Sequence, residues 1–145
     1  MPASLHLVKL CVGAAEVPEL IAWQAARMEE ARAAGRPAIP IHVTRMWPKR
    51  SDELLDGGSL YWVFKGLILA RQRILALEAR TGEDGIQRCA INLDPAVVRT
   101  APRPRRPFQG WRYLPAGEAP PDLTGAAEPD LPAPLALELA QIGVL

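Results

Sequence analysis

The residues best suited to chemistry in this sequence are arginines interleaved with aromatic rings. Between residues 99 and 113 the stretch RTAPRPRRPFQGWRY holds five arginines together with Phe108, Trp111 and Tyr113. Guanidinium groups bind phosphates through paired hydrogen bonds, and flat rings stack on unpaired bases. The prolines stiffen the backbone and so lower the entropy cost of ordering this segment against a ligand. We therefore expect RNA or a nucleotide-like anion as the partner.

Other basic residues lie on the predicted strands and at their ends. Arg45, Lys49 and Arg50 surround the end of one predicted strand, Lys65 ends the next, and Arg71 and Arg73 project from a third. The full set that we expect to bind a nucleic acid or another anion is Arg45, Lys49, Arg50, Lys65, Arg71, Arg73, Arg103, Arg105, Arg106, Trp111 and Arg112.

The net charge of +1 hides a marked asymmetry along the chain. All 17 Lys and Arg residues lie in 1–112 with 11 acids, which leaves +6, whereas 113–145 hold five acids and no base. This asymmetry allows an anionic partner, but it equally allows the acidic tail to fold back onto the arginines. In that structural alternative Arg45 and Arg71 pair with Glu78 or Asp52, and the aromatic rings cap the core.

Motifs for metal binding or catalysis are missing from the sequence. His6, His42, Cys11 and Cys89 are its only imidazole and thiol groups, and none has the spacing of a zinc site. The chain also lacks a nucleophile elbow and a glycine-rich phosphate loop. We expect neither a metal nor a cofactor, and the sequence leaves open whether the protein is an enzyme.

The elements that must position the arginines follow from hydrophobic spacing. Short β-prone runs predict strands at 5–12, 41–47, 59–66 and 86–93, with a further short strand at 110–114. A long helix is predicted from Pro18 to a glycine stop at Gly35, and a helical turn follows Ser51. We place Trp23 in the core with Leu60, Trp62 and Phe64. A short helix is expected to start near Pro134.

Residues 67–80, LILARQRILALEAR, are ambiguous. Their composition favours a helix, but on a helical wheel their Leu and Ile residues spread around most of the circumference. Because the turn TGEDG and a clear strand follow, we predict one arm of a long hairpin. The proline-rich segment after Asp94 is expected to be irregular.

Overall composition is that of a globular protein. The chain has 145 residues, of which 49% are apolar, and this predicts one domain over 1–145, with 115–134 as a proline-rich surface strap. No signal peptide or membrane span is recognisable, so we expect a cytoplasmic protein without membrane contact and with no indicated oligomeric state. The predicted fold class is α+β, with a curved mixed or antiparallel sheet of five or six strands.

Three stretches carry a resemblance to a known family: TRMWPKRSDELLDGGSLYWVFKG, LARQRI and RPRRPFQGWRYL. They resemble a bacterial family of uncharacterised function, domain of unknown function 1489, over nearly the whole chain. That label implies no activity and no catalytic residue. The order of the elements also resembles PUA-like folds, including the ASCH and EVE domains, which implies an open barrel and an association with RNA or modified bases.

Two other functions remain as alternatives. The PUA-like resemblance suggests a small amidohydrolase acting on a modified nucleoside, because some ASCH proteins use a lysine, a threonine and a glutamate. Residues of those types here are Lys65, Thr44 and Glu78, with the lysine as base and the threonine as nucleophile or orienting group. A protein-interaction module using the proline-rich strap would instead expose an apolar patch.

Overall fold

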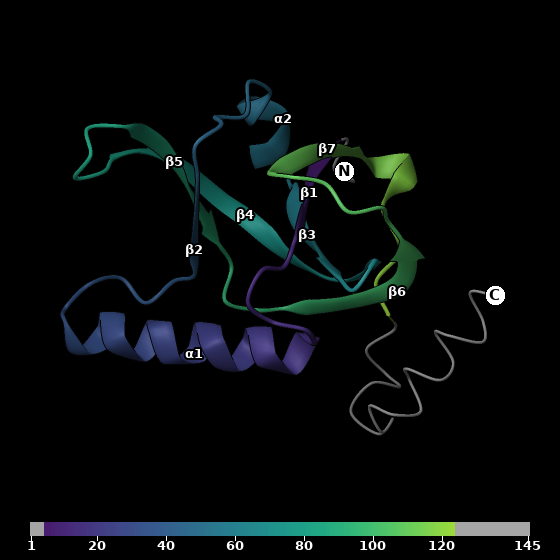
Figure 1. The fold of residues 1–145 in the computed structure, drawn as a ribbon, viewed down its shortest axis with the longest axis horizontal. Coiled ribbons are helices and arrows are strands. Elements are labelled where there is room, and N and C mark those ends of the chain that lie inside the picture. The colour runs from purple at the N-terminus through teal and green to yellow at the C-terminus, as the bar shows by residue number, and fades with distance from the viewer. Residues whose placement is uncertain (1–4, 124–145) are drawn as a thin grey trace.

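The computed structural model describes residues 5–123, which form a mixed seven-stranded sheet with one long helix (Figure 1). Its strands are β1 (Leu5–Leu10), β2 (Ile41–Thr44), β3 (Ser59–Phe64), β4 (Leu67–Thr81), β5 (Gln87–Leu93), β6 (Val98–Pro104) and β7 (Trp111–Pro115). The helices are α1 (Val17–Ala33), α2 (Ser51–Leu55) and the 3-10 turn η1 (Ala116–Glu118). The α+β class is confirmed. The sheet is open, so the expected barrel is wrong, as is the expected number of strands. The helix predicted near Pro134 lies outside the described residues.

β4 is the strand on which the sheet is built. β3 pairs with it along one edge, while β5 pairs with its second half and β6 with its first half. The strand prediction for 67–80 is therefore confirmed. Buried residues alternate along the first half of β4, as expected of a strand, and hydrogen-bonded neighbours on both edges outweigh a composition that favours helix.

β6 corrects the expectation that the chain becomes irregular after Asp94. Prolines are tolerated here because the pairing with β4 is interrupted where one of them lies. Ile68 pairs with Arg103 and Ala70 with Arg99, so β6 carries extra residues between these pairs, and Pro102 is among them. A proline at such a bulge costs no regular ladder hydrogen bond.

β1 joins the beginning of the described chain to its end. It runs parallel to β3 and antiparallel to β7, and His6 lies opposite Leu114. The short strand predicted at 110–114 is thus confirmed as β7. β2 is shorter than predicted and ends at Thr44; it pairs only with β5 and forms an edge of the sheet.

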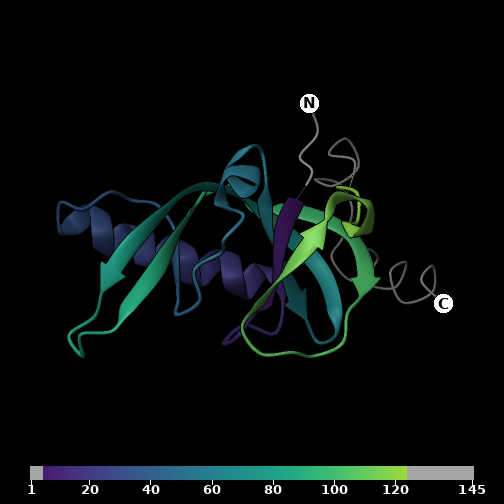
Figure 2. The same cartoon turned by 90° about the horizontal axis from the view of Figure 1, so that it is seen from above.

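Each face of the sheet has its own apolar core. Both helices cover the larger core, and the β6–β7 loop and η1 cover the smaller one, in which Phe108 and Ala119 pack (Figures 1 and 2). The larger core includes Leu7, Val17, Leu20, Leu54, Leu60, Trp62, Phe64, Ile74 and Ile91. The smaller core contains Val8, Tyr61, Val63, Ile68 and Leu114.

Helix α1 starts and stops as predicted. Pro18 lies in its first turn, and Gly35, at φ 75°, ends it. The N–H of Arg36 donates to Ala31 O at 2.8 Å and that of Gly35 to Arg32 O at 3.1 Å, which is a Schellman cap.

Trp23 is not in the core, and its prediction as a core residue is wrong. It is 53% exposed, and the Arg27 guanidinium lies 4.7 Å from the centroid of its ring. The buried residues of α1 are Val17, Leu20, Gln24 and Ala31, a narrow stripe that leaves Trp23 at its side.

Candidate anion-binding site

Basic side chains are carried by the β3–β4 turn, the end of β6, the β6–β7 loop and β7, which are neighbouring parts of the fold. The backbone N–H of Arg105 donates to Gly66 O at 2.8 Å, which fastens the loop to the turn. Figure 2 shows the loop crossing from the end of β6 to the start of β7. We call this group the basic cluster; its members are Lys65, Arg103, Arg105, Arg106 and Arg112.

Phe108 braces two members of the basic cluster. The guanidinium carbons of Arg105 and Arg112 lie 5.6 Å and 5.3 Å from the centroid of its ring, within the range of cation–π attraction. Phe108 is itself half-buried against the smaller core. Arg112 also donates to the carbonyl of Gln109 at 2.7 Å. These contacts limit the rotamers of Arg105 and Arg112 before any ligand arrives.

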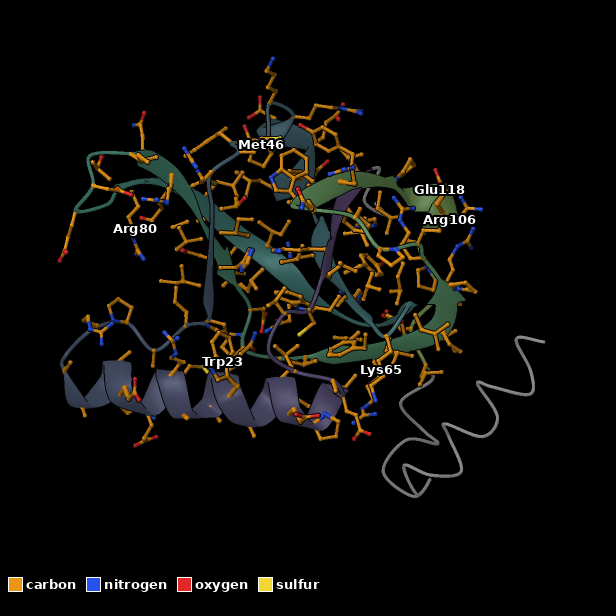
Figure 3. All side chains as sticks on the ribbon, in the orientation of Figure 1. Trp23, Met46, Lys65, Arg80, Arg106 and Glu118 are labelled. Carbon is orange, nitrogen blue, oxygen red and sulfur yellow. The ribbon has the colours of Figure 1, made fainter. Side chains whose placement is uncertain are left out.

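Within residues 5–123 no carboxylate forms an ion pair with the basic cluster. Asp122 binds Arg71 instead of the cluster, and Glu118, which Figure 3 shows beside Arg106, forms no ion pair with it. In the structural alternative, Glu128 or Asp130 of the acidic tail could also neutralise the arginines. Both residues lie outside the described part of the chain. Lys65, Arg103, Arg106 and Arg112 are exposed.

The aromatic residues of the loop belong to the fold. Trp111 is only 5% exposed, and its indole N–H donates to Met46 O at 2.9 Å. The Tyr113 hydroxyl accepts the backbone N–H of Arg50 at 3.1 Å, and its ring lies edge-on to Trp111. Phe108 is covered by the two arginines. None of these rings is free to stack on a base, so Trp111 is a core residue in this structure.

The basic segment 45–50 lies against β7. The same bonds from Trp111 and to Tyr113 place it there. Arg45 and Lys49 are exposed, whereas Arg50 forms a 2.6 Å ion pair with Glu53, which raises the pKa of Arg50.

Arg71 and Arg73 differ in their surroundings. The Arg71 guanidinium holds Asp122 through two hydrogen bonds of 2.7 Å, whereas Arg73 is exposed on β4. We therefore do not count Arg71 in the basic cluster, because its charge is already paired with that of Asp122.

The three catalytic candidates do not come together. Lys65 lies in the β3–β4 turn, and Glu78 lies near the far end of β4, where its carboxylate accepts the Asn92 amide N–H at 2.6 Å. Thr44 ends β2 opposite Cys89, on the Glu78 side of the sheet. The sheet thus places the lysine far from the other two.

Four residues that the sequence analysis assigned to no binding site surround Arg71: His6, Ser59, Tyr61 and Asp122. Their convergence depends on the register of β1, β3 and β4 and on the return of the chain after η1. No local spacing encodes that register. The one available signal was polar residues inside otherwise apolar strands, such as His6 in LHLVKL.

Among residues 5–123, no three His, Cys, Asp or Glu side chains are grouped to hold a metal ion. Burial raises the pKa of both Cys11 and Cys89 to about 11, so neither is a thiolate near neutral pH. No helix in this part of the chain is long and apolar enough to cross a membrane.

Comparison with known proteins identifies the family. A family model described as protein of unknown function (DUF1489) matches residues 7–145. The chain belongs to this family. Membership in DUF1489 confirms the resemblance carried by the quoted stretches. No curated protein and no solved structure matches the chain, and the PUA-like resemblance is therefore without support.

Proposed function

We propose that this DUF1489 protein binds the phosphate backbone of single-stranded RNA through the basic cluster. The observation that carries the proposal is that four arginines and a lysine lie on neighbouring parts of the fold without an ion-paired acid among residues 5–123. Of the four arginines, Arg103, Arg106 and Arg112 are exposed, and guanidinium groups without an ion-paired acid suit phosphate oxygens, which they bind bidentately. Arg45 and Lys49, beside β7, would extend the contact.

The proposal is narrower than recognition of bases. Because Phe108, Trp111 and Tyr113 are occupied by contacts within the fold, the binding rests on phosphates and carries little sequence preference. Binding of this kind depends strongly on salt, because each neutralised phosphate releases counterions.

The test is fluorescence anisotropy with a labelled single-stranded RNA at several salt concentrations. For five phosphate contacts on a single strand, log Kd should rise with log salt at a slope of about 3.5, so that affinity falls about 100-fold between 50 and 200 mM. The triple variant R103A/R105A/R106A should lower that slope by about 2.

A matched control removes the same charge elsewhere. Arg32, Arg36 and Arg80 lie outside the basic cluster, and Figure 3 shows Arg80 at the opposite end of the molecule from Lys65 and Arg106. R32A/R36A/R80A should keep the salt slope close to that of the unaltered chain. Equal losses in the two triple variants would show only a general charge effect and would overturn the proposal.

The alternatives receive less support. The amidohydrolase requires Lys65, Thr44 and Glu78 in one pocket, and they lie apart. An interaction module built on the proline-rich strap requires an apolar patch there, and residues 124–134 of that strap lie outside the described part of the chain. The large apolar side chains exposed in residues 5–123 lie elsewhere: Val12, Ile21, Trp23, Ile41, Val43, Met46, Trp47, Leu55 and Leu75.

A further inference from the structure

A second candidate site is formed by side chains that are not members of the basic cluster. His6 on β1, Ser59 and Tyr61 on β3, and Arg71 on β4 line a hollow of about 350 Å³, which the segment from Ala116 to Asp122 borders on its other side. The hollow is open to solvent, so it suits a small anionic group held from one side and does not enclose a whole drug-sized molecule. The four side chains share one face because His6 and Val8 alternate with Leu5 and Leu7, and Tyr61 pairs directly with Arg71.

The Arg71 guanidinium is held in the geometry that recognises an oxyanion. Its Nε donates to one carboxylate oxygen of Asp122 and its Nη2 to the other, both at 2.7 Å, while Nη1 donates to Ser59 Oγ at 3.0 Å. Two parallel bonds from one guanidinium are how arginine binds a carboxylate or a phosphate. Asp122 thus occupies the position that the anion of a ligand would take.

The other groups in the hollow can donate further hydrogen bonds. The backbone N–H of Ser59 donates to His6 Nδ1 at 3.0 Å, so neutral His6 carries its proton on Nε2. Burial and the nearby charge of Arg71 lower the pKa of His6, which keeps the ring neutral near pH 7. Ser59 accepts from Arg71 and keeps its own O–H proton for another acceptor. Tyr61 contributes a phenol that burial keeps protonated, by raising its pKa.

The arrangement favours binding over nucleophilic catalysis. A serine nucleophile needs a base on its hydroxyl, yet His6 Nδ1 is bonded to the backbone N–H of Ser59 and the hydroxyl oxygen faces the Arg71 cation. Donors without an activated nucleophile are what an anion-binding pocket requires.

The segment that carries Asp122 is attached to β6 by backbone pairing and to the smaller core through Ala119. Asp122 bridges to Thr100; the N–H of Ala101 donates to Pro121 O at 2.8 Å and that of Leu123 to Arg99 O at 2.9 Å. The side chain of Asp122 is 43% exposed and that of Arg71 24% exposed. The pair is reachable from solvent, but its two-bond geometry makes it stronger than an ordinary surface ion pair, so only an anion that engages Arg71 through the same two bonds can displace Asp122.

We propose that this hollow binds the carboxylate or phosphate group of a small molecule on Arg71, with Ser59, His6 and Tyr61 as further donors, and that Asp122 is a built-in competitor which the ligand displaces. The site is distinct from the basic cluster, and the inference does not rest on the proposed RNA binding.

The test uses inorganic phosphate and, separately, acetate as probes, followed by NMR of the histidine ring signals. The chain has two histidines, so His42 serves as an internal reference for His6. All measurements use the R103A/R105A/R106A background, and sodium chloride at equal ionic strength controls for screening. Phosphate or acetate should shift the His6 signal to saturation and leave that of His42 unchanged.

Two variants decide the outcome. D122N removes the competing charge and keeps the shape, so the affinity for the probe should rise about tenfold, as expected when an internal occupant no longer holds the site. R71K keeps a positive charge and loses the fork, and it should abolish saturation. Should Arg71→Lys impair folding, Tyr61→Phe is the substitute and should weaken binding several-fold.

A response of the D122N variant to phosphate assigns the hollow to phosphate groups, and one to acetate assigns it to carboxylates. The inference is overturned if neither probe shifts the His6 signal, if D122N binds no tighter, or if R71K binds equally well. In the last two cases the Arg71–Asp122 pair is only a structural latch for the segment.

Discussion

His42 is the residue whose charge state matters most to the larger core. It projects from β2 toward Trp62, with the ring centroids 5.7 Å apart and the planes at 84°. Its Nε2 is buried and has no hydrogen-bond partner among residues 5–123. Burial, with a smaller contribution from the charge of Lys9, lowers the pKa of His42 to about 4. Protonating this ring in the folded state is therefore costly.

The free energy of unfolding should fall as the pH drops from 6.5 toward 4. In this window the unfolded chain takes up a proton on His42 near pKa 6.5 while the folded chain does not, so the unfolded state gains stability. The loss should reach about 2–3 kcal/mol, at about 1.4 kcal/mol per pH unit. Urea unfolding at pH 7.5 and 4.5 measures it.

The control for that measurement is His42→Leu, which removes the titrating ring and keeps an apolar side chain. His6 contributes in the same direction because its pKa is also lowered, so the variant should retain part of the acid sensitivity. An equal loss of stability in the two proteins would contradict the assignment to His42.

Residue types were predicted more successfully than residue surroundings. The sequence places arginines and aromatic rings in one stretch, and the structure keeps them together. Whether Trp111 faces solvent or donates to Met46 O depends on the segment that lies across from it, and that segment is 65 residues away in the chain. Trp23 shows the same limit. It is exposed while its neighbour Gln24 is buried, so a small rotation of the helix decides which of the two side chains enters the core.

At the level of the elements, a buried amide pair fastens α1 to the sheet. Gln24 Nε2 donates to Gln72 Oε1 at 2.9 Å, and Gln72 Nε2 donates back to Gln24 Oε1 at 2.7 Å. Gln72 also accepts the indole N–H of Trp62 at 2.9 Å and donates to Asp94 O at 3.0 Å. Gln24 is 5% exposed and Gln72 fully buried, so all of these bonds replace water.

Replacing one glutamine of this pair should lower the free energy of unfolding by more than the net contribution of one hydrogen bond. Gln24→Leu leaves a buried amide without its partner, and the free energy of unfolding should fall by about 2 kcal/mol. In a double-mutant cycle with Gln72→Leu, the loss in the double variant should be smaller than the sum of the single losses by about 1 kcal/mol or more. Additive losses would show that the two amides act independently.

The elements themselves follow from the sequence wherever a local signal is complete. Helix α1 has its proline, its spacing and its Gly35 stop, and the β4–β5 hairpin has its turn. β6 was not predicted, because prolines are normally excluded from a paired strand. Pro102 is accommodated only because the pairing of β6 with β4 is interrupted at this point. The hollow around Arg71 could not be predicted either, because its side chains meet only when β1, β3 and β4 are paired in the observed register.

On the scale of the whole molecule, β1 closes the sheet between strands that lie far apart in the chain. It pairs with β3 and with β7, so Leu7 lies opposite both Leu60 and Tyr113. Forming the second pairing closes the longest loop of the described chain, and its entropy cost must be met before the contacts stabilise it. We expect β7 to dock late in folding.

Leu114→Ala tests this order. Leu114 is 1% exposed in the smaller core, so its truncation should lower the free energy of unfolding by about 2–4 kcal/mol. If β7 docks late, most of that change appears as faster unfolding in stopped-flow measurements. Ile91→Val in the local β4–β5 hairpin should instead slow folding. A slower folding rate for Leu114→Ala would place β7 in the folding nucleus.

The reciprocal amide pair that joins α1 to β4 has a consequence for the sequences of the DUF1489 family. Each glutamine supplies both the donor and the acceptor that the other needs. A glutamate at one position would place two acceptor oxygens next to each other. An apolar residue there would leave the remaining amide buried without a hydrogen-bond partner. A change at residue 24 is then tolerable only with a matching change at residue 72. Across relatives that keep this fold, the two positions should be exchanged together, as a correlated pair of substitutions linking a helix to a strand.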